Sequence, residues 1–188
     1  MTDLFQSRRS IRRYTAEPVA RHELEQIVEA AGFAPSGMDS QSWMFLVLGG
    51  AALEELRVAV RDLFRTMELG PQHPPFYARC KEWAADDAWA FFYGAPALLI
   101  IANRADYRNA MPDSAAAAEN ALLKAAELGL GSCWITTLTG TCDEPPIRRV
   151  LRKLGLPDDY RVYVSAALGH AAEQPAPSPR KARVLWHL

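Results

Sequence analysis

Short apolar runs alternate with segments of helical periodicity along most of the chain, and this alternation restricts the possible folds more than any other sequence feature. Four runs have the length and the flanking turn residues of buried strands, at residues 43–48, 98–102, 132–137 and 160–168. Segments typical of helices lie at residues 20–31, 53–63, 78–93, 114–128 and 145–154. No internal repeat is visible. The alternation predicts an α/β or α+β fold.

Turn and cap residues mark the ends of these helices. Gly32 ends the first one, Asp113 or Ser114 can cap the alanine-rich one, and Gly129 ends it. The segment at residues 78–93 is unusually aromatic and predicts a helix with an aromatic face. That face would consist of Trp83, Trp89, Phe91, Phe92 and Tyr93.

A proline-rich tail follows the last predicted strand. Three prolines within residues 175–179 exclude a helix there, yet Val184, Leu185 and Trp186 are apolar. We expect one domain over residues 1–188, with residues 171–188 as an extended arm that reaches another surface, for which a second subunit is a candidate. A disordered tail is the alternative.

Composition narrows the class of protein. The 188 residues are 49% hydrophobic and 23% charged, with a formal net charge of -1, which describes a folded domain without the basic excess of nucleic-acid or membrane-surface binders. Three cysteines without a CxxC motif indicate reduced thiols. The N-terminus lacks a signal-peptide pattern, and the longest apolar run, residues 95–102, is too short to span a bilayer. We expect a cytoplasmic protein.

Common catalytic motifs are absent from the sequence. It contains no HExxH, GxSxG, GxxxxGK[ST] or GxGxxG, and its four histidines show no metal-ligand spacing. These absences disfavour a metalloenzyme or a hydrolase. Either the chain is not catalytic, or a cofactor supplies the chemistry.

Two basic clusters lie at opposite ends of this nearly neutral chain. Residues 7–14, SRRSIRRY, carry four arginines, and Arg180, Lys181 and Arg183 lie near the C-terminus. Each cluster alone would be read as a solvated surface. Together they predict one phosphate site, since guanidinium groups donate paired hydrogen bonds to phosphate oxygens.

The segment APSGMDSQSW, residues 34–43, connects a predicted helix to a buried strand. Its small and polar residues could bring backbone N–H groups close to a planar polar ligand. An ordinary helix-to-strand connection is the alternative for this segment taken alone.

The motifs RRSIRRY, APSGMDSQSWMFLVL, GLGSCWITT and LGH…PRKAR, in this order, resemble the FMN-dependent nitroreductase family over essentially the whole chain. The resemblance implies an α+β fold with a central mixed sheet flanked by helices. It also implies an entwined homodimer with FMN at the subunit interface and an arm that crosses to the partner.

The resemblance also assigns site residues. The FMN phosphate would be held by Arg8, Arg9, Ser10 and Arg12 together with Lys181 and Arg183. Because Arg180 is also basic, the C-terminal motif can be aligned in two ways that differ by one residue. The loop residues Pro35, Ser36, Gly37, Asp39 and Gln41 would contact the ribityl chain and ring, with Asp39 and Ser42 replacing the usual Asn and Pro. Trp134, Ile135, Thr136 and Thr137 would lie beside the ring. Thr136 and Thr137 stand where some members carry a Glu-Gly pair near flavin N5. Without that Glu, the chain resembles the smaller, more divergent members of the family.

The activity implied is ping-pong reduction: NADH or NADPH gives a hydride to flavin N5, and a nitroaromatic, quinone or related small electrophile takes the electrons. No side chain is required as catalytic acid or base, and no metal, nucleic-acid or membrane partner is expected. Enone reduction, dehalogenation and flavin fragmentation remain open. So do a flavin sensor without turnover and, as a distant third reading, a colourless nucleic-acid binder.

Overall fold

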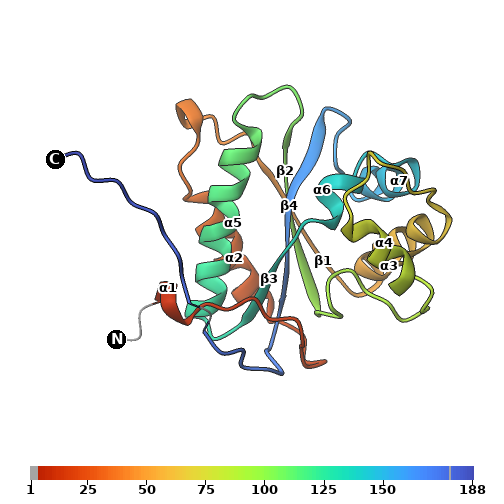
Figure 1. Ribbon diagram of the computed structural model, residues 1–188, viewed down its shortest axis with the longest axis horizontal. Coiled ribbons are helices and arrows are strands. Elements are labelled where there is room, and N and C mark those ends of the chain that lie inside the picture. The colour runs from red at the N-terminus through yellow and green to blue at the C-terminus, as the bar shows by residue number, and fades with distance from the viewer. Residues whose placement is uncertain (1–3, 178) are drawn as a thin grey trace.

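The computed structural model describes residues 4–177 and 179–188, and at its centre lies a four-stranded sheet (Figure 1). The strands are β1 (Met44–Gly49), β2 (Ala97–Arg104), β3 (Gly131–Ile135) and β4 (Tyr160–Gly169). Their spatial order is β1-β2-β4-β3, and each pair of neighbours is antiparallel. All four strands were predicted from their apolar runs.

The antiparallel sheet corrects the prediction of a mixed sheet. Strands β2 and β3 point the same way and are connected through helix α5 (Ala110–Glu127), which is the arrangement that normally yields parallel neighbours. Strand β4 lies between them and runs in the opposite direction, so it pairs antiparallel with both. Parallel pairing occurs in the described part of the chain as an isolated bridge between Ser10 and Ser132.

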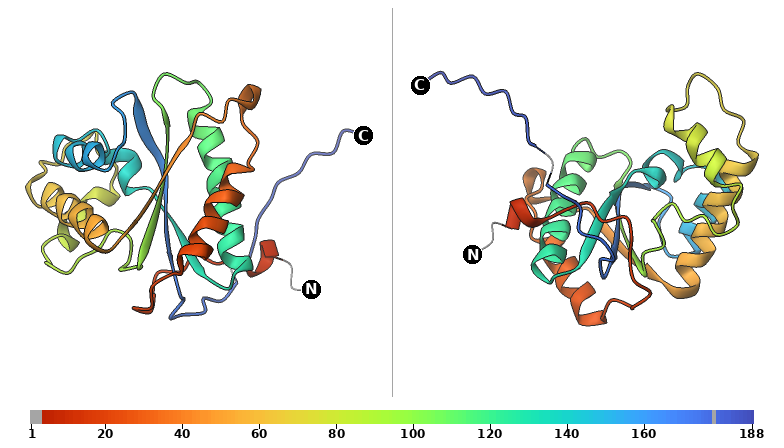
Figure 2. Two further views of the ribbon diagram at one scale, coloured as in Figure 1. Left: turned by 180° about the vertical axis from the view of Figure 1, so that it is seen from behind. Right: turned by 60° about the horizontal axis from the view of Figure 1, so that its bottom comes forward.

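Helices cover both faces of the sheet (Figures 1 and 2). Helices α2 (Arg21–Gly32) and α5 cover one face, and the short α1 (Leu4–Ser7) lies near the end of α5. The other face carries α3 (Gly50–Thr66), α4 (Phe76–Trp83), α6 (Thr137–Thr141) and α7 (Pro145–Lys153). The result is an α+β fold with three layers.

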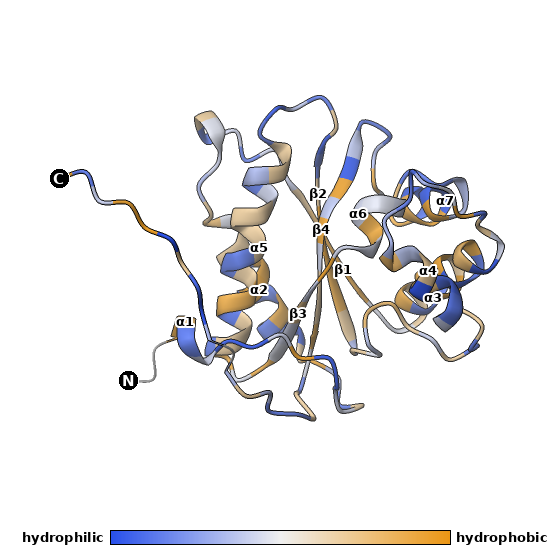
Figure 3. Ribbon diagram, viewed as in Figure 1, coloured by the Kyte–Doolittle hydropathy of each residue, from blue (hydrophilic) through white to orange (hydrophobic). Residues whose placement is uncertain are grey.

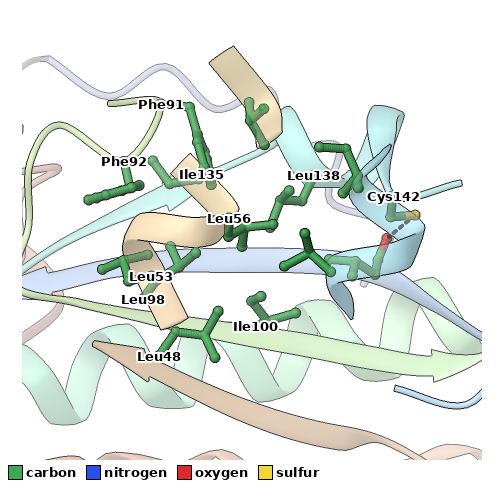
Figure 4. Packing of buried hydrophobic residues seen from close by; sticks show 14 of the residues in the cluster. Leu48, Leu53, Leu56, Phe91, Phe92, Leu98, Ile100, Ile135, Leu138 and Cys142 are labelled. Carbon is green, nitrogen blue, oxygen red and sulfur yellow. Dashed lines mark hydrogen bonds between the residues drawn. The ribbon is translucent and has the colours of Figure 1, made fainter. Parts of the chain in front are cut away.

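Strand β2 is buried on both sides, which explains its continuous apolar run. Leu98 and Ile100 face the α3 layer, whereas Leu99 and Ile101 face the layer of α2 and α5. Figure 4 shows Leu98 and Ile100 among side chains from α3, α6 and β3. In Figure 3 the central parts of the sheet strands carry apolar colours, whereas most of the loops at the ends of the sheet are hydrophilic.

Several element boundaries differ from the predictions. Strand β3 ends at Ile135 and not at Thr137, which begins α6. Helix α4 ends at Trp83, and residues 84–94 form turns, in which Tyr93 has a left-handed φ of 61°. The predicted aromatic helix over residues 78–93 is therefore wrong in its second half. Helix α5 begins at Ala110, so Asp113 lies in its first turn and does not cap it. Its carboxylate binds a loop instead, as described below.

The C-terminal arm leaves the body of the molecule as an extended segment (Figures 1 and 2). After the bridge of Ala171 to Tyr14, the described residues form no helix or strand. Val184, Leu185 and Trp186 are exposed. Residues 1–3 and 178 of the predicted domain lie outside the described residues. Among the helices of the described chain, none has the length and apolarity needed to cross a membrane.

Candidate functional site

The arginine-rich N-terminal stretch lies along the outer edge of β3. Ile11 N–H donates to the carbonyl of Ser132 at 2.9 Å, and Ser10 forms the parallel bridge to the same residue. On its other side, Ala172 N–H donates to the carbonyl of Arg13 at 2.9 Å. The edge of β3 and the start of the C-terminal arm therefore hold the stretch between them.

A pocket of about 350 Å³, which we call the arginine pocket, opens beside this stretch. Its walls are formed by Ser7, Arg8, Arg9, Ile11, Ala126, Gly129, Leu130, Gly131, Ser132, Ala171, Glu173, Gln174 and Pro175. Two guanidinium groups thus border it, and the buried Oγ of Ser132 has no hydrogen-bond partner among the described residues. These donors fit a phosphate group, since an anion would receive charged hydrogen bonds from the arginines.

Two carboxylates lie close to these arginines. Arg8 Nε is 3.9 Å from Glu119 Oε1, and the backbone N–H of Arg12 donates to Glu173 Oε1 at 2.6 Å. They offset part of the positive charge of the stretch. Glu173 also lines the pocket, so a phosphate held there would bind beside a carboxylate as well as beside arginines.

A second pocket, of about 220 Å³, lies at the other end of β3, and we call it the ring pocket. It brings together the four predicted ring-side residues Trp134, Ile135, Thr136 and Thr137. Most of its remaining wall is aromatic, and its full lining outside those four residues is Phe76, Cys80, Trp83, Trp89, Ala90, Phe91 and Tyr93. The aromatic pattern of this segment was noticed in the sequence, but its place in the site was not predicted.

Arg12 lines neither pocket but contacts one wall residue of each, Glu173 through its backbone N–H and Tyr93 through its guanidinium. Its guanidinium carbon lies 5.8 Å from the centre of the Tyr93 ring, and its interaction with that side chain raises the pKa of Arg12. Strand β3 has five residues, so its two ends, each bordering one pocket, lie about 13 Å apart. An elongated ligand with a phosphate at one end and a flat ring at the other fits this arrangement.

The predicted loop has an unusual backbone. Met38, Asp39 and Gln41 adopt left-handed φ angles of 57°, 52° and 44°. Within the loop, Gln41 N–H donates to Ser36 Oγ at 3.1 Å, and Gln41 Nε2 donates to Asp39 Oδ1 at 2.7 Å. The carboxylate that replaces the usual Asn thus accepts a hydrogen bond inside the loop. Pro35 is exposed at its start.

The loop and the arginine pocket do not meet within one chain. The loop is bound at Asp113, in the first turn of α5, whereas the arginine pocket includes Ala126, in the last turn. Thirteen residues of helix separate these positions by about 20 Å. Pro35, Ser36, Gly37, Asp39 and Gln41 therefore form a separate cluster from the arginines.

The C-terminal basic residues are placed differently from one another. Lys181 and Arg183 are exposed on the arm, which extends away from the body of the molecule (Figure 1). Arg180 lines a pocket of about 490 Å³ together with Arg9, Phe5, Gln6 and Pro177. Within the described chain, Arg180 is thus the basic residue of the arm that shares a pocket with the N-terminal arginines.

A family model described as the nitroreductase family matches residues 5–170. The chain belongs to the nitroreductase family. This match confirms the family predicted from the order of the four motifs. Both β3 pockets are built largely from residues inside the matched region, whereas the arm lies beyond it.

Known members show what this family member resembles. A nitroreductase with bound FMN from Bacteroides fragilis is 32% identical, with a TM-score of 0.83 over 96% of this chain and 92% of that one. An iodotyrosine deiodinase from Thermotoga neapolitana is 27% identical over 186 residues, covering 95% of this chain and 92% of its own. An NAD(P)H FMN reductase from Bacillus subtilis is 29% identical over 181 residues, covering 92% of this chain and 66% of its own.

Proposed function

We propose that the protein is an FMN-dependent NAD(P)H oxidoreductase that reduces nitroaromatic, quinone or related small electrophilic acceptors. The observation that carries this proposal is the pair of pockets at the two ends of β3, one bordered by arginines and one by aromatic rings. FMN has a matching anionic end and a matching planar end. The similarity to an FMN-bound nitroreductase supports the same assignment.

The proposed roles follow from these positions. Arg8 and Arg9, which line the arginine pocket, hold the phosphate with the help of Ser132. Ser10 and Arg12 lie outside the lining of that pocket; Ser10 adds its hydroxyl from the bridge to Ser132, and Arg12 lies between the phosphate and the ring. Trp134, Ile135, Thr136 and Thr137 border the ring. When bound, FMN accepts a hydride from NADH or NADPH and passes electrons to the acceptor. The aromatic wall excludes water from the ring pocket and gives a flat acceptor a surface to stack on.

The separation of the loop from the arginines favours a homodimer. About 20 Å of helix α5 lies between Asp113, which binds the loop, and Ala126 in the arginine pocket, and no loop residue lines that pocket. Loop residues Pro35, Ser36, Gly37, Asp39 and Gln41 would therefore reach an FMN held by the arginines of the partner subunit. The arm, residues 171–188 of a single domain 1–188, would cross to that subunit and bring Lys181 and Arg183 to a phosphate. Three buried free cysteines favour a reducing cytoplasmic location.

Purification and mass spectrometry test the cofactor. We expect a yellow protein that releases FMN on heating, and recovery of FAD or of no flavin after reconstitution would contradict the proposal. Arg8→Ala should remove a charged hydrogen bond worth roughly 1.5–3 kcal/mol, which raises the FMN dissociation constant about ten- to over a hundredfold. Arg13→Ala is the matched control, because Arg13 is exposed and does not line the arginine pocket.

Reductive dehalogenation is the second candidate activity, and the similarity to the Thermotoga neapolitana deiodinase favours it over enone reduction or flavin fragmentation. A screen of acceptors against the reduced protein separates these activities. It should include a nitroarene, a quinone and an iodophenol. A flavin that NAD(P)H bleaches and that no acceptor reoxidises would indicate a sensor without turnover.

A further inference from the structure

The loop at residues 36–41 needs outside support to keep its shape. Three of its non-glycine residues, Met38, Asp39 and Gln41, have left-handed backbones, a conformation that is uncommon for residues other than glycine and is tolerated best by Asp and Asn. Such strained segments persist where the surrounding structure fixes them, and they cluster at ligand sites. Hydrogen bonds inside the loop, including those from Asp39 N–H and Ser40 N–H to the carbonyls of Ser36 and Gly37, join residues that are exposed or half-buried, so they supply only part of that constraint.

The support comes from the segment that enters helix α5. Gly37 N–H donates to both carboxylate oxygens of Asp113, at 3.2 and 3.1 Å. The hydroxyl of Tyr107 lies 2.9 Å from the carbonyl of Gly37 and 3.0 Å from Asp113 Oδ2, and its single proton can be donated to either. Ser40 Oγ donates to the same hydroxyl at 2.9 Å. Two side chains thus hold both backbone groups of Gly37.

A side chain at position 37 would displace the groups that surround Gly37. A Cβ atom there would lie 2.1 Å from Asn109 Nδ2 and 2.7 Å from the Tyr107 hydroxyl. Asp113 is only 6% exposed, so its carboxylate is committed to this contact and does not face solvent. A buried carboxylate without hydrogen-bond partners would be costly, and Gly37 and Tyr107 supply these partners.

We propose that Asp113 and Tyr107 are positioning residues that hold the loop in the conformation needed to contact FMN in the partner subunit. This inference rests on the proposed function. Neither residue belongs to the family motifs in the sequence, and neither lines the arginine pocket or the ring pocket. They act through the loop.

Asp113→Asn is the first test. The substitution keeps the size of the side chain but replaces one acceptor oxygen with a donor that opposes Gly37 N–H. We expect the FMN dissociation constant to rise about tenfold or more, with a changed visible circular dichroism of the bound flavin. Tyr107→Phe should act in the same direction. Asp106→Asn is the matched control, because Asp106 is an acid of the same connection that pairs with Arg104 at the surface.

Mixed dimers separate positioning from a general loss of stability. Subunits with Arg8→Ala and subunits with Asp113→Asn, carrying different tags, are combined and the heterodimer is isolated. If each site draws its arginines from one chain and its loop from the other, one site of the heterodimer has both defects and the other has none. One site per heterodimer should then bind FMN with wild-type affinity, although neither variant homodimer does.

Several results would overturn the inference. Unchanged FMN affinity in Asp113→Asn, in a wild-type background that binds FMN, would overturn it alone. Heterodimers without a wild-type site would show that the Asp113 defect is not confined to one site, and would overturn positioning across the interface. A wild-type protein that binds no FMN would overturn the proposed function together with it.

Discussion

Cys80, Cys133 and Cys142 are buried free thiols, and burial raises the pKa of each. Burial raises the pKa of the Cys80 thiol from 9.0 to about 11. For Cys133, nearby Arg12 and Arg8 oppose the effect of burial. All three thiols are therefore protonated and poorly reactive at neutral pH, in keeping with packing roles.

The raised pKa of Cys80 predicts a loss of stability in alkali. Above pH 9 the unfolded thiol loses its proton first, while the folded thiol keeps its proton until about pH 11. The free energy of unfolding should therefore be unaffected by this group below pH 9 and should fall as the pH rises from 9 to 11. Urea denaturation at pH 8, 9, 10 and 11 measures the slope. Cys80→Ala should give a shallower decline than the wild type, and identical slopes would contradict the assignment.

At the scale of elements, α3 supports the aromatic segment with three arginines spaced four residues apart. Arg57 Nη1 donates to the carbonyls of Asp87 and Trp89, at 2.7 and 2.9 Å. Arg61 donates to the same Asp87 carbonyl, and Arg65 binds the Asp87 carboxylate at 2.8 Å. These bonds satisfy carbonyls that a continued helix would have paired internally. The arginines thus help to hold residues 84–94 as turns that line the ring pocket.

Arg65→Ala should loosen this segment without unfolding the protein. The variant loses hydrogen bonds to the carbonyls of Ala84 and Ala85 and the pair with Asp87. We expect a local cost of roughly 1–3 kcal/mol, seen as faster amide hydrogen exchange in residues 84–94. Arg21→Ala is the control, since its pair with Glu25 is exposed and should contribute little. Unchanged exchange in residues 84–94 would contradict a supporting role.

At the scale of the whole molecule, the C-terminal arm carries apolar side chains that its own chain does not bury. The exposed residues are Val184, Leu185 and Trp186, with Trp186 at 76%, and they follow a stiff segment rich in proline. Exposed apolar residues at the end of an extended arm are typical of a contact with a second chain. The proposed dimer gives them a surface to bury against.

Trp186→Ala should weaken that dimer. A buried aromatic anchor at such a contact can contribute over about 2 kcal/mol, so the dimer dissociation constant should rise roughly thirtyfold. Light scattering on a dilution series measures it, with His187→Ala as the neighbouring control. A dimer that Trp186→Ala leaves unchanged would remove the anchoring role of the arm. A monomeric wild type would contradict a site built from two chains.

The sequence alone determined the elements whose patterns are local. The apolar run of β2 follows from burial on both faces, the periodicity of α2 and α3 from one buried face each, and the family from the order of four motifs. Arg8, Arg9 and the residues 134–137 could be assigned to a site because each set lies within one contiguous stretch. None of these inferences required knowledge of which segments meet in space.

Only the tertiary structure decided the features that depend on distant partners. The antiparallel sheet arises because β4, last in sequence, lies between β2 and β3. Residues 84–94 form turns because arginines of α3 bind their carbonyls. Asp113 lies inside the first turn of α5 and not at the predicted cap, and its carboxylate accepts hydrogen bonds from Gly37 N–H. The roughly 20 Å between the loop and the arginine pocket is likewise set by the length of α5 in the folded chain. Local patterns specify which faces are buried, but the contacts that place a loop or a strand join residues far apart in sequence.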